Sequence, residues 1–307
     1  MAKKIIFSSI SVILGLVFVF SGLTKLYPIE LFELTFVDLG VASWYTAPVI
    51  ARLMISIEFF LGIMLILNFS LRKFTLKATI AILVVFTVYL IVQLIMEGNK
   101  GNCKCFGNVL VMTPLESIIK NLVMLAVSLV LYRWHKGFTL PFRKIIVILV
   151  VLSSLSLPFI LNPPDFIVAY QSRQETVGYK LKLDTLYNST DLKKPETELR
   201  NGKHIIAFMS LTCPHCRIAA YKLHILKKQD PDIPIFFILN GKDQDIAPFF
   251  EDTKATNIPY MLLLGKRFVD LAGYNLPRIL LINNLIVEEK VNYIDLNYNS
   301  INKWLKK

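Results

Sequence analysis

The sequence predicts a membrane α-helical bundle of about five transmembrane helices, followed by a smaller C-terminal α/β domain. Hydrophobic residues make up 54% of the 307-residue chain, and the mean hydropathy of +0.55 exceeds that of ordinary soluble domains of this size. The long apolar runs lie in residues 1–161. We therefore expect a transmembrane domain over 1–161, a linker over 162–199 and a globular domain over 200–307.

Five segments are apolar enough and long enough to cross a membrane, whose hydrocarbon core needs roughly 20 residues as a helix. These segments are 5–23, 48–68, 77–97, 113–132 and 143–161. The first has the apolar length of a signal peptide. No small-residue cleavage site follows it and further spans come after, so we expect it to remain as a helix.

Basic residues between the spans predict the orientation of the chain. They cluster before the first span, between the second and third, and between the fourth and fifth, at Lys3, Lys4, Arg72, Lys73, Lys77, Arg133, Lys136, Arg143 and Lys144. Because cytoplasmic loops are enriched in Lys and Arg, the N-terminus is expected in the cytoplasm. Five crossings of the cell inner (cytoplasmic) membrane then place the globular domain outside, in the periplasm.

The net charge of +12 comes mostly from the membrane half. Up to residue 161 there are 14 Lys and Arg against 6 Asp and Glu, and beyond it 20 against 16. Nucleic-acid binding would need a basic, aromatic-interleaved face on the globular half, which its sequence lacks. The basic excess therefore indicates membrane topology, and no nucleic-acid partner is expected.

The chain has four cysteines, which form two close pairs. Cys103 and Cys105 lie in GNCKCFGN, between the third and fourth predicted spans, and Cys213 and Cys216 lie in LTCPHCRI of the globular half. With the predicted orientation, both pairs are extracytoplasmic, where disulfides form and persist. The pattern therefore predicts two redox-active thiol pairs on one side of the membrane.

The globular half alternates strand-like and helix-like patterns. Residues 203–210 are typical of a buried strand, and residues 217–229 have helical spacing with lysines in the last turn. Downstream we expect strands, a helix, a hairpin through Asn283-Asn284 and a terminal helix, at 233–240, 247–255, 260–265, 278–293 and 299–307. The polar residues before 200 predict a tether with a short strand.

A strand, a C-x-x-C motif and a helix in this order make a redox motif. Cys213 stands at the helix N-terminus, where backbone N–H groups and the helix dipole stabilise a thiolate. Pro214 suits the first helical turn, and His215 adds a donor or positive charge beside that thiolate. Cys213 is therefore the predicted nucleophile, and Cys216 resolves the mixed disulfide. Half of a zinc site and an inert structural disulfide are the alternatives, although structural zinc needs four ligands.

With these motifs, residues from about 200 to 307 resemble a thioredoxin-fold domain of the periplasmic disulfide oxidoreductase type. YNLPRILLI, residues 274–282, is similar to the family's loop in which a cis-proline faces the active site. The resemblance assigns that role to Pro277. One departure is Thr212, which stands before the first cysteine where many family members have Trp.

The Cys103–Cys105 pair is separated by one residue. Bridging cysteines this close needs a sharp bend, which Gly101 and Gly107 permit. A strained disulfide is more oxidising than a structural one. A disulfide that closes so short a loop adds little stability, because it removes little chain entropy. A Cu(I) site that includes the Met112 thioether is the alternative.

Charged residues inside the predicted spans are functional candidates, because ionisable groups in a bilayer are costly. Glu58 falls near the middle of the second span, with Lys25 as a candidate partner, whereas Arg52 stands near the span's end and is expected to snorkel. Glu116 and Lys120 are one turn apart in the fourth span. They predict either a helix cap with an ion pair or, with Glu58, a quinone site or proton path beneath the cysteines.

The membrane half resembles the MauE family of methylamine-utilisation membrane proteins, within the wider DoxX-like group. The resemblance rests on SGLTKL after the first span, ARLMISIEFFLGIMLI over 51–66, and CKCFG in the cysteine loop. Similar families include a partner with a thioredoxin fold encoded nearby. The resemblance therefore implies that this chain fuses the two parts.

These features predict a membrane-bound thiol–disulfide oxidoreductase that acts as a two-station relay. Extracytoplasmic protein thiols would reduce the Cys213–Cys216 disulfide, then the Cys103–Cys105 disulfide, and finally a membrane quinone. Delivery of electrons in the reverse, reductive direction is the second hypothesis, and a copper-binding or assembly factor is the third. We expect membrane lipid and quinone as partners and no resident metal.

Overall fold

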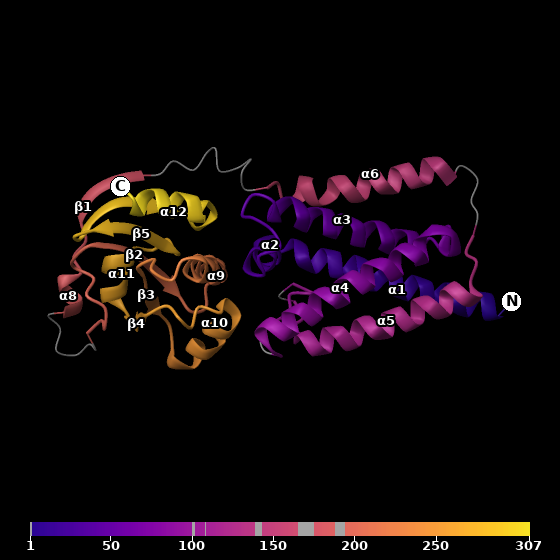
Figure 1. The fold of residues 1–307 in the computed structure, drawn as a ribbon, viewed down its shortest axis with the longest axis horizontal. Coiled ribbons are helices and arrows are strands. Elements are labelled where there is room, and N and C mark those ends of the chain that lie inside the picture. Colours follow the sequence, from indigo (N-terminus) through magenta and orange to yellow (C-terminus); the bar gives the residue numbers. More distant parts are fainter. Residues whose placement is uncertain (1, 100–101, 108, 139–142, 165–174, 188–193) are drawn as a thin grey trace. The chain divides into compact units, whose positions relative to one another are not determined.

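The computed structural model describes the chain apart from residues 1, 100–101, 108, 139–142, 165–174 and 188–193. The chain divides into two compact units, Met1–Pro164 and Asp165–Lys307. The first is helical, and the second is built on a mixed β-sheet (Figure 1).

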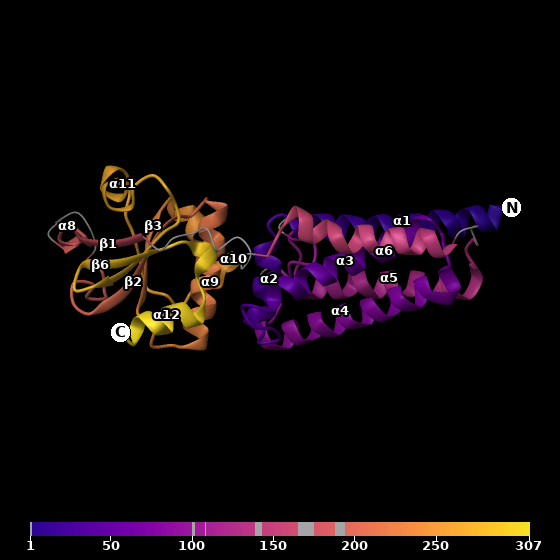
Figure 2. The same ribbon diagram turned by 90° about the horizontal axis from the view of Figure 1, so that it is seen from above.

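Among the described residues of the first unit, five helices are long and apolar enough to cross a membrane. They are α1 (Ala2–Leu26), α3 (Ala47–Ile66), α4 (Leu76–Glu97), α5 (Pro114–Trp134) and α6 (Arg143–Leu161). Each overlaps one of the five predicted spans. The helices run side by side (Figures 1 and 2), with α1 and α6 packed on α3, and α5 packed on α4.

The closest helix packing is the crossing of α1 and α3. A Cβ atom built on Gly15 would lie 2.6 Å from the carbonyl oxygen of Gly62, and one built on Gly62 would lie 2.9 Å from that of Gly15. Two facing glycines therefore let the helix backbones touch, as small residues do between membrane helices.

Two short helices were not expected from the sequence. Helix α2 (Ile29–Asp38) follows α1 and packs on α3 with nearly all its side chains buried. The π-helical turn η1 (Leu71–Thr75) follows Ser70, which has a left-handed backbone conformation with φ of +48°. Both are too short to span a bilayer, so the lengths of the apolar runs did not predict them.

The second unit contains a six-stranded sheet in the order β1-β6-β5-β2-β3-β4. The strands are β1 (Glu175–Lys180), β2 (Lys203–Ser210), β3 (Ile235–Asn240), β4 (Tyr260–Leu262), β5 (Arg278–Asn283) and β6 (Ile286–Val291). Strands β2, β3 and β4 are parallel to one another, β5 is antiparallel to β2, and β6 is antiparallel to β5. The order β6-β5-β2-β3, with a helix crossing from β2 to β3, is the predicted thioredoxin fold.

Helices cover the sheet, which is buried on both faces. They are α8 (Asp184–Tyr187), α9 (Pro214–Gln229), α10 (Ile246–Thr253), α11 (Lys266–Ala272) and α12 (Tyr298–Leu305). One hydrophobic cluster joins Ile206 and Phe208 of β2 to Phe268 of α11. Because side chains alternate along a strand, Ile205 and Ala207 face the opposite side, where both are fully buried.

The predicted linker over 162–199 is too long. Within it, β1 pairs with β6 as an edge strand, and Leu183, Leu186 and Leu199 are buried in the core of the α/β unit. The segment is polar overall, so its few separate leucines were not recognised as core residues. The predicted hairpin is correct, but its turn lies at Asn284-Leu285, where both residues have positive φ.

Candidate functional site

The Cys103–Cys105 loop bends sharply between its two cysteines. Lys104 has φ of +59°, and the Cys105 backbone N–H donates to Cys103 Sγ at 3.4 Å. Gly107 has φ of +55°, and a Cβ atom there would lie 2.1 Å from a carbonyl oxygen of α1. Gly107 therefore permits the close approach to α1, whereas the bend between the cysteines, expected at the flanking glycines, lies at Lys104. Gly101 lies outside the described residues.

Side chains from α1 and α5 hold the cysteine loop in place. The hydroxyl of Ser117, on α5, lies 2.9 Å from Cys103 Sγ. The hydroxyl of Ser21, on α1, donates to the carbonyl oxygen of Cys105 at 3.2 Å, and the Cys103 N–H donates to the carbonyl oxygen of Met112 at 2.9 Å. The loop is therefore a fixed part of the bundle.

The two thiols of this loop differ in acidity. A hydrogen bond from the Cys105 thiol, aided by Ser117, the Cys105 N–H and the charge of Lys120, lowers the pKa of Cys103 to about 6 despite its burial. The same thiol–thiol hydrogen bond, together with burial, raises the pKa of Cys105. Cys103 is therefore the thiolate of the pair near neutral pH, and Cys105 keeps its proton.

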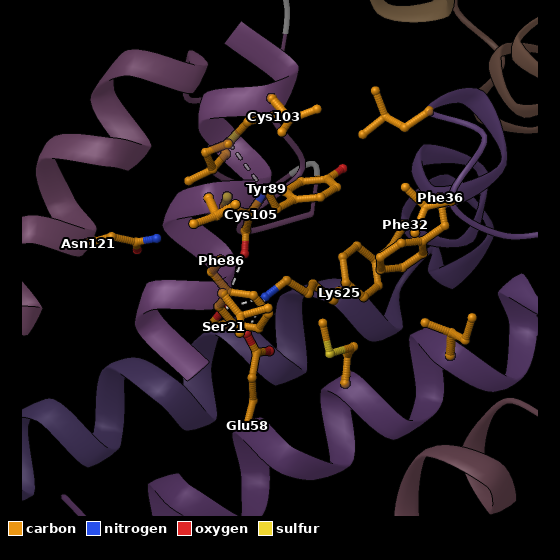
Figure 3. Close-up of a pocket in the computed structure, with 18 of the residues that line it drawn as sticks. Ser21, Lys25, Phe32, Phe36, Glu58, Phe86, Tyr89, Cys103, Cys105 and Asn121 are labelled. Carbon is orange, nitrogen blue, oxygen red and sulfur yellow. Dashed lines mark hydrogen bonds and ion pairs between the residues drawn. The ribbon is translucent and has the colours of Figure 1, made fainter. Parts of the chain in front are cut away.

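A pocket of about 350 Å³ lies beside the cysteine loop inside the membrane unit (Figure 3). Aromatic rings of Phe32, Phe36, Phe86 and Tyr89 form much of its wall. In Figure 3, Cys105 lies between Cys103 and a polar group of side chains deeper in the bundle. Beside these rings, its lining includes Ser21, Lys25, Glu58, Met54, Cys103, Cys105, Lys120 and Asn121.

The polar group in this pocket is a buried ion pair. Lys25 Nζ lies 2.5 Å from Glu58 Oε1, and the two side chains are only 5% and 3% exposed. Ser21 Oγ accepts a hydrogen bond from Lys25 at 2.7 Å and donates to Glu58 Oε1 at 3.1 Å. Among the described residues, Glu58 Oε2 has no hydrogen-bond partner. Lys25 is thus the partner that the sequence suggested for Glu58.

Glu116 and Lys120 were both predicted to contribute to the pocket, but in the structure they have different roles. Lys120 lines the pocket, with Nζ 4.2 Å from the centre of the Phe106 ring. Glu116 instead completes a capping box with Thr113, accepting the Thr113 N–H at 2.8 Å. Glu116 does not line the pocket, and the α5 N-terminus uses its carboxylate, which is the helix-cap alternative.

Arg52 does not snorkel. Its side chain is 1% exposed, and Nη1 lies 2.5 Å from Glu33 Oε1 and 2.7 Å from the carbonyl oxygen of Pro48. The sequence interpretation failed because Glu33 lies on α2, the short helix that was not predicted.

The C-P-H-C motif begins α9, as predicted. Cys213 is the N-cap, Pro214 is in the first turn, and Cys213 Sγ accepts the Cys216 N–H at 3.3 Å. Cys216 is fully buried and accepts the Ser210 N–H on Sγ at 3.4 Å, and burial raises its pKa well above that of an ordinary thiol. Cys213 is only partly buried. The geometry therefore fits an attacking Cys213 and a resolving Cys216.

His215 is held by a residue that the sequence did not single out. The hydroxyl of Tyr293 lies 3.0 Å from His215 Nδ1, and the ring centres are 5.6 Å apart. Tyr293 belongs to the 3₁₀ turn η4 (Tyr293–Asp295), which the buried Lys222 of α9 holds by donating to the carbonyl oxygen of Ile294 at 3.0 Å. The turn and the motif are therefore linked through α9.

Pro277 follows a cis peptide bond from Leu276, as the resemblance implied. Strand β5 begins at Arg278, which pairs with Phe208 near the carboxyl end of antiparallel β2. This register places Pro277 beside the end of β2, from which the C-P-H-C loop emerges.

The sequence did not point to Ser21, Ser117, Phe86, Tyr89 or Tyr293. Ser21 stands four residues before Lys25 and Ser117 three residues before Lys120, so each serine shares a helix face with a predicted residue. Phe86, Tyr89 and Tyr293 meet the sites only through tertiary packing.

Comparisons with known proteins agree with this two-part architecture. Residues 3–133 match the family model described as methylamine utilisation protein MauE. The curated relative Protein TlpB of Flavobacterium psychrophilum is 26% identical over 304 residues, covering 83% of this chain and 82% of the relative.

Solved structures match the α/β unit. The thioredoxin domain of a thiol-disulfide oxidoreductase from Bacteroides vulgatus is 19% identical and covers 34% of this chain and 81% of its own, with a TM-score of 0.29. A thiol:disulfide interchange protein from Bacteroides sp. is 19% identical and covers 43% and 86%, with a TM-score of 0.32. Because both TM-scores are low, the thioredoxin fold of the α/β unit rests on its own strand order and strand directions. The chain therefore joins an N-terminal part that matches the MauE family model, over residues 3–133, to a C-terminal domain with the thioredoxin fold.

Proposed function

We propose that this protein is a membrane thiol–disulfide oxidoreductase that carries electrons from extracytoplasmic protein thiols to a membrane quinone. The observation that carries the proposal is that Cys103 and Cys105 line one aromatic pocket with the buried Lys25–Glu58 pair. A thiol pair beside an apolar pocket with a polar end suits thiol–disulfide exchange on one side and a small membrane-soluble acceptor on the other.

The first exchange takes place at the thioredoxin-fold domain. A substrate thiolate attacks Cys213 of the Cys213–Cys216 disulfide, forming a mixed disulfide and releasing Cys216. The second substrate thiolate then attacks the substrate sulfur of that mixed disulfide, so the substrate leaves oxidised and the pair is a dithiol. The partial exposure of Cys213 and the burial of Cys216 support this order.

The second exchange moves the electrons to the membrane pair. Cys213 thiolate attacks Cys105, the less buried residue of the Cys103–Cys105 disulfide, and Cys103 leaves as the thiolate that its low pKa favours. Cys216 then attacks Cys213 and releases Cys105, which takes up a proton. Because both pairs belong to one chain, this step has a high effective concentration.

The pocket has the features that a quinone head group requires. Its aromatic rings provide flat apolar surfaces, Lys25 and Lys120 provide donors for carbonyl oxygens, and Glu58 Oε2 is a buried acceptor with no partner among the described residues. A bound quinone would take up the two electrons and two protons that the dithiol releases on forming its disulfide. Cys103 supplies the reactive thiolate, while Lys25 and Glu58 hold or pass protons.

The orientation follows the basic clusters of the membrane domain. With the N-terminus in the cytoplasm, the Cys103–Cys105 loop and the thioredoxin-fold domain lie in the periplasm of an inner-membrane protein. Both thiol pairs then share the compartment in which disulfides persist.

Anaerobic thiol counting in lipid nanodiscs tests the relay. The protein is fully reduced, freed of reductant and given a quinone, and free thiols are counted by alkylation and mass spectrometry. All four thiols should disappear in step with quinone reduction, and the Cys103→Ser/Cys105→Ser variant should keep Cys213 and Cys216 reduced. Persistence of the thiols in the unmodified protein would exclude quinone as acceptor. Stoichiometric copper on the reduced protein would instead favour a metal-handling role.

A further inference from the structure

The membrane unit has a second pocket, of about 700 Å³, at the end of the bundle opposite the cysteine loop. It is lined by α3, η1, the loop before α6 and α6 itself. Phe60 and Met64 of α3 and Val151 of α6 form part of its apolar wall. Figure 1 shows that this end holds the N-terminus and the connection from α5 to α6.

Two loops are joined at the base of this pocket. Phe138 pairs with Phe69 in a short β-bridge, and its N–H donates to the carbonyl oxygen of Asn68 at 2.8 Å. His135 Nε2 lies 3.0 Å from Asn68 Oδ1. Gly137 has φ of +75°, and a Cβ atom there would lie 2.7 Å from the Asn68 carbonyl oxygen. The loop before η1 and the loop before α6 therefore form one built surface.

Three lysines surround the apolar wall, and each comes from a different element. Lys73 comes from η1, Lys136 from the loop and Lys144 from the first turn of α6. All three are exposed, and the lining contains no acidic residue. Within the described part of the chain, none of the three forms an ion pair. Their charge is therefore left for an outside partner.

We propose that this pocket is a binding site for an anionic phospholipid. The headgroup phosphate would lie among Lys73, Lys136 and Lys144, and an acyl chain would follow the apolar wall past Phe60 and Val151. Basic pockets between membrane helices on the cytoplasmic side favour such headgroups. A zwitterionic lipid carries its own compensating cation, so it gains less from the three lysines. The site shares no lining residue with the pocket near the cysteines.

Lipid titration of the purified full-length protein, followed by native mass spectrometry, tests this proposal. Phosphatidylglycerol should bind at least about tenfold more tightly than phosphatidylcholine. Each lysine near an anionic lipid contributes about a fivefold factor in binding. The variant Lys73→Gln/Lys136→Gln/Lys144→Gln should therefore lose affinity for phosphatidylglycerol on the order of a hundredfold and keep its affinity for phosphatidylcholine.

The matched control is Lys3→Gln/Lys4→Gln/Lys77→Gln, which removes the same charge from lysines outside the pocket lining. It should leave phosphatidylglycerol affinity within about threefold, since diffuse surface charge is screened. An equal loss in both triple variants would show general attraction to an anionic surface and overturn the proposal.

A steric pair tests the acyl-chain part. Val151→Trp fills the pocket, whereas Leu152→Trp places the same ring on an exposed neighbouring residue that does not line it. Only Val151→Trp should weaken phosphatidylglycerol binding. Undiminished binding in Val151→Trp would show that the lipid does not occupy the pocket.

Discussion

Lys25 Nζ and Glu58 Oε1 lie 2.5 Å apart inside the membrane unit, in the pocket that also contains both loop cysteines. Charges buried to this degree are costly, and each compensates the other. The pair joins α1 to α3, the two helices that also meet at Gly15 and Gly62, so it has both a structural and a proposed redox role.

Substitutions at this pair separate the two roles. Glu58→Gln leaves a buried ammonium unpaired, which should cost about 3–5 kcal/mol in unfolding free energy. Lys25→Met/Glu58→Met removes both charges and should restore stability to within about 1–2 kcal/mol, because an apolar pair of similar volume replaces them. Thermal unfolding measures the first effect. The double variant should reduce quinone more slowly than the unmodified protein, even though its stability is restored. Normal turnover in the double variant would exclude a proton role for Glu58.

The thiolate of Cys103 should persist to unusually low pH. Since hydrogen bonds lower its pKa from 9.0 to about 6, the alkylation rate of Cys103 should stay high as pH falls and be lost only below about 6. Ser117→Ala removes one of these hydrogen bonds and should shift the midpoint upward. Ser128→Ala, a buried serine on the same helix, is the control. Equal midpoints in all three proteins would contradict the assigned role of Ser117.

The order of attack can be read from trapped mixed disulfides. With Cys216→Ser and Cys103→Ser combined, Cys213 and Cys105 are the remaining cysteines and, with oxidised glutathione added as the two-electron oxidant, should form a stable disulfide between the two domains. The matched variant Cys216→Ser/Cys105→Ser leaves the buried Cys103 as the target and should give much less. Peptide mapping under non-reducing conditions measures both. A larger yield in the matched variant would reverse the roles of Cys103 and Cys105.

Tyr293 should position His215 and thereby tune the C-P-H-C pair. Tyr293→Phe removes one hydrogen bond, worth about 1 kcal/mol, which weakens the support that His215 gives to the Cys213 thiolate. The reduction potential should therefore become more negative by about 20 mV. Tyr274→Phe, at a residue that is 91% exposed, should leave the potential unchanged. Equilibration with glutathione at fixed ratios measures both, and equal potentials would show that the Tyr293 contact is only structural.

The sequence by itself determined the five spans, the thioredoxin-fold order and both cysteine pairs. Each is a local pattern: about 20 apolar residues, alternating elements, or two cysteines within four residues. Cys213 and Cys216 needed no tertiary information, because one helix N-terminus holds the motif. The capping box of Thr113 and Glu116 was equally local.

Tertiary structure decided which charges meet. Glu33 reached Arg52 only because α2, too short for a span, packs on α3. Lys120 lines the pocket, whereas Glu116 caps the N-terminus of α5, although the two stand one helical turn apart. Ser117 of α5 meets Cys103 of the loop before it, and Tyr293 of η4 meets His215 of α9. Helical spacing fixes neighbours within one helix, but packing alone fixes which helices share a pocket.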